Sequence, residues 1–157
     1  MTSMRNMTPS LADISPTLGL NLDEKRAVEH FLGKTSVQAE ALFREHAIYY
    51  AEDLMWMGEQ AFVFYFPAFC RFLNSTYADG DADALSSLAS VVTFRTKHEP
   101  KSIADARDAI LSALNYCVDN YAKFRVEAAI YGDLRNKLLR LRRTVIALSP
   151  PVCRMKM

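Results

Sequence analysis

Six side chains in one stretch of the chain have the types and spacing needed to bind a positively charged partner. They comprise four carboxylates and two large aromatic rings: Glu45, Tyr49, Glu52, Asp53, Trp56 and Glu59. At about 100° per residue, a helix would place all six within one sector of roughly 120°. Tyr and Trp are enriched among the residues that dominate binding energy at interfaces, and surrounding carboxylates attract a basic partner from a distance. We therefore predict that this helical face binds a basic protein.

A second interpretation of the same residues stays open. Large aromatic side chains are usually well buried, so Tyr49 and Trp56 could instead lie beneath a neighbouring helix. The acids would then pair within the protein with Arg135, Arg140 or Arg142. The two interpretations differ in whether Tyr49 and Trp56 are exposed.

The remaining residue types form no recognised catalytic or metal-binding pattern. The three histidines lie in separate segments, no CxxC or Glu-x-x-His spacing occurs, and the five glycines stand alone. The acidic string at residues 79–83 begins like a calcium loop, but Ala84 and Ser90 stand where that loop needs glycine and glutamate. We expect no catalysis, no cofactor, no bound metal and no small-molecule substrate.

A basic segment near the C-terminus offers an alternative function. Five cations surround a leucine stripe there: Arg135, Lys137, Arg140, Arg142 and Arg143. A basic amphipathic helix can bind nucleic acid or an anionic membrane surface. The segment lacks aromatic residues for base stacking, and the whole chain has a net charge of only +1. Solvated arginines on an outer helix of a bundle are therefore the favoured interpretation, and nucleic-acid or membrane binding is the alternative.

Apolar residues recur at helical spacing along most of the chain, and no segment requires a strand. Helices are predicted over residues 23–32, from the capping box of Thr35 and Gln38 to about Met57, over 81–95, from Ile103 to Phe124, and over 134–148. Residues 96–100 are expected to form a loop, after which Ser102 and Asp105 give a second capping signal. These helices must position the candidate face.

The most aromatic stretch is AFVFYFPAFCRFL, residues 61–73. Pro67 lacks an amide donor and disfavours helical backbone at Phe66, so we expect a break or kink with a new helix beginning near Pro67. Each Phe or Tyr buries ~150–250 Å², which favours the centre of a core over a ligand pocket. The sequence therefore predicts an all-α fold, a single-domain bundle of about six helices kinked near Pro67.

Length and composition are those of one globular domain, since half of the 157 residues are hydrophobic. We predict a loose N-terminal arm over residues 1–20, a helical domain over 21–149 and a C-terminal tail over 150–157. No run reaches the roughly 20 apolar residues of a membrane helix, and residues 1–20 lack the apolar core of a secretory signal. Three scattered cysteines suggest no disulfide framework. A cytoplasmic protein is expected.

The stretch DLMWMGEQAFVFYFPAFCRFL, residues 53–73, resembles a segment of small all-helical bacterial proteins of unknown function. In those proteins an aromatic F-x-Y-Y-L-P-A-F pattern precedes a polar turn and further helices. This chain departs from the pattern at Phe64 and Phe66, where tyrosine and leucine are usual. Proteins of this size and style are frequent among immunity proteins encoded beside secreted bacterial toxins. The resemblance implies a helical fold and, as an expectation, an inhibitor that occludes a cognate toxin.

Overall fold

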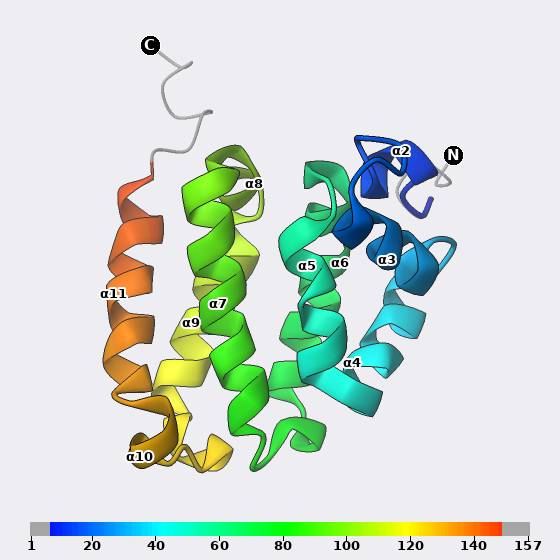
Figure 1. Ribbon diagram of the computed structural model, residues 1–157. Helices are drawn as coiled ribbons and strands as arrows, with labels where there is room; N and C mark the ends of the chain where they lie inside the picture. Colours follow the sequence, from blue (N-terminus) through cyan, green and yellow to red (C-terminus); the bar gives the residue numbers. More distant parts are fainter. Residues whose placement is uncertain (1–6, 149–157) are drawn as a thin grey trace.

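The computed structural model, shown in Figure 1, describes residues 7–148 and is helical almost throughout. Within that range it has ten α-helices, two 3₁₀ turns and no strand. The α-helices are α2 (Leu11–Ile14), α3 (Leu22–Phe31), α4 (Ser36–Ala51), α5 (Asp53–Trp56), α6 (Glu59–Asn74), α7 (Ala82–His98), α8 (Pro100–Asp105), α9 (Arg107–Asp119), α10 (Ala128–Tyr131) and α11 (Leu134–Ala147). The 3₁₀ turns are η1 (Thr76–Ala78) and η2 (Tyr121–Phe124). The predicted all-α, single-domain fold is confirmed.

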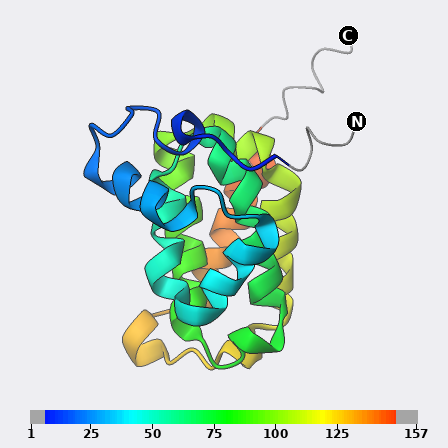
Figure 2. The ribbon, with the colours of Figure 1, turned by 90° about the vertical axis from the view of Figure 1, so that its right-hand side faces the viewer.

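Six of these helices have ten or more residues, namely α3, α4, α6, α7, α9 and α11, and the other four have four to six residues. Helix α6 packs against α4, α9, α2 and α8, while α11 packs against α9 and α7. Figures 1 and 2 show α2 and α8 at one end of the bundle and α10 at the other. Helices α2, α8 and α10 therefore lie at the two ends of a bundle built by the six long helices, whereas the short helix α5 packs against α3, α4, α6 and α7.

The aromatic stretch on α6 forms the core, as its composition predicts. Its rings at positions 62, 65, 66, 69 and 72 are all buried. The Phe69 ring lies 5.0 Å from that of Phe43 on α4, measured between centroids. The Tyr65 hydroxyl donates to the carbonyl oxygens of Phe31 and Lys34, at 2.8 Å each. The single hydroxyl proton of Tyr65 is shared between a carbonyl group at the end of α3 and one in the loop that follows, and so joins this end of α3 to the central helix.

The predicted new helix at Pro67 is wrong, because α6 runs without interruption from Glu59 to Asn74 with Pro67 inside it. An internal proline costs a helix about 3 kcal/mol or more. Burying one phenylalanine contributes about 1.5–3 kcal/mol, and α6 buries four of them. The aromatic face therefore outweighs the local cost of the proline, and the helix continues through it.

The helix breaks lie upstream of Pro67 instead. Helix α4 ends at Ala51, α5 spans only four residues, and Met57 and Gly58 are extended before α6 begins. The Gly58 amide donates to the carbonyl oxygen of Ile14 at 3.0 Å. A side chain on Gly58 would collide with the turn after α2, so glycine is required here for close approach of two backbones. The predicted helix from Thr35 to Met57 is therefore divided into α4 and α5, and α4 itself is kinked at His46, whose backbone is not helical.

The capping box predicted at Thr35 and Gln38 is confirmed, whereas the capping signal predicted at Ser102 and Asp105 is wrong. Thr35 Oγ1 accepts from the Gln38 amide at 3.1 Å, and the Gln38 side chain accepts from the Thr35 amide at 2.8 Å. Ser102 instead lies buried inside α8, because α7 extends to His98 and Pro100 starts the next helix. The predicted helix from Ile103 to Phe124 is divided among α8, α9 and η2.

Part of the predicted loose arm is packed onto the bundle. Ser10 caps α2, and both Ile14 and Ser15 are fully buried. The sequence signal is weak because a four-residue helix is too short to show helical periodicity. Residues 1–6 of the arm and the predicted tail at 150–157 lie outside the described residues.

Candidate functional site

The predicted binding face is divided by a kink inside α4, where the backbone of His46 is not helical, and by the two boundaries that separate α4, α5 and α6. Glu45 and Tyr49 lie on α4, Glu52 follows its last residue, Asp53 and Trp56 lie on α5, and Glu59 begins α6. A regular advance of about 100° per residue holds only within one continuous helix. The six side chains consequently differ in exposure: Glu45, Tyr49 and Glu52 are exposed, Trp56 and Glu59 are half-buried, and Asp53 is buried.

Asp53 is the member of the predicted face that the fold buries. Its exposed fraction is 3%, and its Oδ2 lies 2.6 Å from Nδ1 of His30 on α3. Burial raises the pKa of this carboxyl to about 6, and the hydrogen bond from His30 opposes that rise. Asp53 therefore joins α3 to α5, and it is not available to an external partner.

A hydrogen-bonded chain extends from Asp53 to the surface, which the sequence did not predict. The hydroxyl of Tyr49 lies 3.2 Å from Nε2 of His30, whose ring also contacts Tyr50. The carboxylate fixes the imidazole, which in turn positions the phenol, in the order found in catalytic triads. Tyr49 lines none of the three cavities described below. The arrangement orients Tyr49 at the surface, where 44% of its side chain is exposed.

Trp56 and Glu59 are engaged within the protein. The Trp56 ring is half-buried against Phe94 on α7, with 4.8 Å between ring centroids. The carboxylate of Glu59 pairs with Lys101 at 2.9 Å. The second interpretation is thus correct in placing Trp56 against a neighbouring helix, but the partner of Glu59 is Lys101 and none of the arginines of α11.

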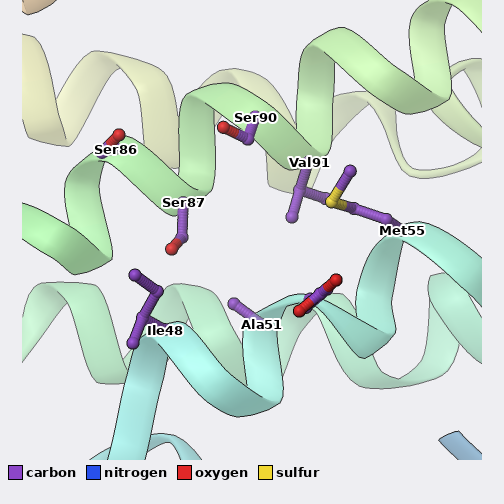
Figure 3. A pocket seen from close by; sticks show the side chains of 8 residues that line it. Ile48, Ala51, Met55, Ser86, Ser87, Ser90 and Val91 are labelled. Carbon is purple, nitrogen blue, oxygen red and sulfur yellow. The ribbon is translucent and has the colours of Figure 1, made fainter. Parts of the chain in front are cut away.

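One exposed member of the predicted face, Glu52, borders a groove between the α4–α5 segment and α7, whereas Glu45 lines a neighbouring cavity and Tyr49 lines neither of the two. The groove is lined by Glu52 and by Ile48, and 47% of the surface of Ile48 is exposed. The volume of the groove is about 200 Å³. Figure 3 shows Ile48, Ala51 and Met55 opposite Ser87 and Val91. We call it the α4–α7 groove; its lining residues are Ile48, Ala51, Glu52, Met55, Ser86, Ser87, Ser90 and Val91.

Acidic side chains predominate beside the α4–α7 groove. An adjoining cavity of about 320 Å³ shares Ile48 and is also lined by Glu45, Asp81 and Asp83, with Arg44 as its one arginine. The Arg44 guanidinium stacks on the Tyr77 ring, 4.8 Å from its centroid. The local excess of carboxylates gives this end of α4 a negative potential.

The basic helix is the second candidate surface. Leu134, Leu138 and Val145 are buried, while most of the basic residues of α11 are exposed. Arg142 is half-buried, and its Nη1 donates to Oδ1 of Asn115 at 2.9 Å. Exposed basic side chains surround a buried apolar stripe, as expected for an outer helix of the bundle whose arginines are solvated.

Three further observations concern the whole described range. Within residues 7–148, no three or more His, Cys, Asp and Glu side chains gather as a metal site would require. None of the helices in that range is both long and apolar enough to cross a membrane. Comparison with known proteins found no matching family model, no matching curated protein and no matching solved structure.

Proposed function

We propose that this chain is a non-catalytic protein-binding module whose partner inserts a basic side chain into the α4–α7 groove. The observation that carries the proposal is an open groove with an apolar floor and a carboxylate at its edge. Ala51, Met55 and Val91 supply the apolar floor, and Glu52 is exposed beside them. Lysine and arginine have an apolar stem and a charged head, so they match both parts of this groove.

The surroundings of the groove suit a protein interface. Ile48 and Tyr49 are large and exposed on the same turn of α4, and a partner would bury them. Tyr49 is held by His30, so little side-chain entropy is lost on binding. Glu45 and Glu52 would attract a basic surface and increase its association rate.

An immunity-type inhibitor is the form of this function that we favour. The aromatic segment at residues 53–73 resembles one in small helical bacterial proteins, a class in which toxin-neutralising partners are frequent. A nuclease toxin holds phosphate with lysine and arginine, so its active-site cleft would offer basic side chains to the groove. Occlusion of that cleft would neutralise the toxin without catalysis by this chain.

The proposal is tested with the product of the neighbouring gene, if that gene encodes a secreted toxin. The double variant Glu45→Lys and Glu52→Lys should slow association and reduce its salt dependence, since both carboxylates are exposed. Ile48→Ala should mainly accelerate dissociation. Asp119→Lys, on an exposed acid at the end of α9, is the matched control and should leave both rates unchanged. If the folded double variant binds with the kinetics of the parent, the groove is not the binding site.

The basic helix α11 supplies the alternative outcome of the same study. Retention of the protein on immobilised RNA or DNA that falls steeply with salt would favour nucleic-acid binding. Replacing Arg135 and Arg140 by glutamine should then abolish retention. If the α11 variant is no longer retained on nucleic acid and the parent does not bind the toxin, the protein-binding proposal is overturned.

A further inference from the structure

The hydrogen-bonded chain across α3, α4 and α5 ends at the surface in a tyrosine that is held against a base. Oδ2 of Asp53 lies 2.6 Å from Nδ1 of His30, and the hydroxyl of Tyr49 lies 3.2 Å from Nε2 of the same ring. Exposure increases along this chain, from 3% for Asp53 to 44% for Tyr49. A hydroxyl group within hydrogen-bond distance of a base, with a third group orienting that base, is the arrangement of an activated nucleophile.

The carboxylate determines which nitrogen of His30 accepts a hydrogen bond. Burial raises the pKa of Asp53 to about 6, so this carboxyl is ionised at about pH 8. An ionised carboxylate only accepts hydrogen bonds, so the proton of a neutral His30 ring lies on Nδ1 and Nε2 is left as the acceptor. The Tyr49 hydroxyl then donates to Nε2, and a proton that leaves Tyr49 has a base within reach.

Neighbouring rings hold Tyr49 in this position. Its ring centroid lies 5.1 Å from that of His30, 5.5 Å from that of His46 and 5.0 Å from that of Tyr50. A phenol fixed among three rings keeps its hydroxyl directed at the base, so little orientational freedom is lost when a reactant approaches.

Other tyrosines of the described residues lack this arrangement. Tyr77 is more exposed than Tyr49, at 65%, its ring carries the Arg44 guanidinium, and its hydroxyl has no hydrogen-bond partner within residues 7–148. Tyr131 donates to the carboxylate of Asp83, which is a weaker base than an imidazole. Exposure alone would therefore make Tyr77 the most reactive phenol, whereas the neighbouring base favours Tyr49.

Two features restrict what Tyr49 can react with. It lines neither the α4–α7 groove, nor the adjoining cavity, nor a third cavity of about 530 Å³ between the α5–α6 junction and the end of α7. None of these three cavities therefore presents a substrate to its hydroxyl, which favours a small reactant that arrives from solution. Burial and then the charge of Glu45 raise the pKa of the adjacent Tyr50, and the same negative potential repels an anionic reactant.

We propose that Tyr49 is a covalent modification site that accepts an acyl group from a small, neutral, activated ester. The phenol oxygen attacks the carbonyl carbon of the ester, and its proton passes to Nε2 of His30. A bond forms between that oxygen and the acyl carbon, the bond from the acyl carbon to the leaving alkoxide or phenoxide breaks, and His30 returns its proton to the leaving group or to water. The product is an ester of Tyr49 that no longer donates to His30. One acyl group is consumed per chain, and the step needs no partner in the α4–α7 groove, so its test is independent of the proposed function.

The probe is 4-nitrophenyl acetate, added to the folded full-length chain at about pH 8. Mass spectrometry of peptides follows acetylation of each tyrosine, and Tyr77 in the same sample is the matched internal control. We expect Tyr49 to be acetylated at least about tenfold faster than Tyr77, although it is the less exposed of the two. Equal rates at the two tyrosines, or faster acetylation of Tyr77, would overturn the proposal.

Two variants test whether the base causes this difference. His30→Gln can still donate to Asp53 but has no basic nitrogen, and Asp53→Asn permits the tautomer in which Nε2 carries the proton. Each variant that circular dichroism shows to be folded should acetylate Tyr49 about tenfold more slowly and leave the rate at Tyr77 unchanged. If Tyr49 keeps the parent rate in either folded variant, the activation by His30 is excluded. Acetyl phosphate, an anionic donor, should give a smaller ratio of Tyr49 to Tyr77 acetylation, and a larger ratio would refute the choice of a neutral donor.

Discussion

Replacing Arg95 by methionine tests how the break between α5 and α6 is stabilised. The guanidinium donates to the carbonyl oxygens of Leu54, Met55 and Met57, at 2.9, 3.2 and 2.8 Å. It also donates to Oγ of Ser102 at 3.0 Å. Methionine fills much of the same space but donates nothing, so Arg95→Met leaves these acceptors without their partner.

The expected loss follows from two opposing contributions. A hydrogen bond from a charged donor contributes about 1.5–3 kcal/mol, and Arg95 donates three protons, two from Nη1 and one from Nε, to its four acceptors. Burial lowers the pKa of Arg95 to about 10, which corresponds to a cost of about 3 kcal/mol for the charged form. The hydrogen bonds outweigh that cost even at the low end of their range. Arg95→Met should therefore lower the free energy of unfolding by about 3–5 kcal/mol.

Urea denaturation followed by circular dichroism measures this free energy. Arg71→Met is the matched control, because Arg71 also donates to another helix, α4, but is exposed, pairing with Glu40 at 2.8 Å. An exposed pair contributes at most about 1 kcal/mol. If both variants lose the same small amount, Arg95 does not stabilise the helix break and the reasoning is refuted.

Three further predictions concern packing and pH. Gly58→Ala should destabilise the protein by about 1–3 kcal/mol, because its methyl group would lie 2.8 Å from Pro16 Cγ; unchanged chemical denaturation would disprove that close packing. Phe69→Ala should lower the free energy of unfolding by about 3–5 kcal/mol, and Phe64→Ala by less because Phe64 is half-buried. If both variants melt at the temperature of the parent, these residues do not form the core. Burial raises the pKa of Asp53 to about 6, so the folded state keeps a proton there that the unfolded chain loses near pH 4. The free energy of unfolding should therefore fall by up to about 3 kcal/mol as pH rises from about 4 to 6. Denaturation experiments across that range should show a weaker pH dependence for Asp53→Asn, whose side chain does not titrate.

Local sequence signals predicted the elements whose stability is mainly local. The capping box of Thr35 and Gln38 forms as expected because both hydrogen bonds are made within four residues. The fold class and the buried aromatic segment were also predictable. Helical periodicity and the area of several large rings leave few other arrangements in a chain of this length.

The predicted binding face was only partly correct, for a reason that lies far away in the chain. Periodicity from Phe43 to Met57 is compatible with one long helix. The break before Gly58 depends on the carbonyl group of Ile14 and on the side chain of Arg95. Contacts between such distant residues leave no periodic pattern. Asp53 itself lies before that break, and it was misplaced because the helical wheel was extended across the non-helical backbone at His46 and across the boundary between α4 and α5.

The sequence by itself determined an all-helical domain, its aromatic core and the acidic character of α4. Tertiary packing decided where helices end, since at Pro67 the burial of aromatic rings outweighed a local preference that would have stopped α6. Tertiary packing also brought His30 to Asp53, and Arg95 to the carbonyl groups at the junction of α5 and α6. These side chains come from different helices, and only the folded chain fixes the distances on which their chemistry depends.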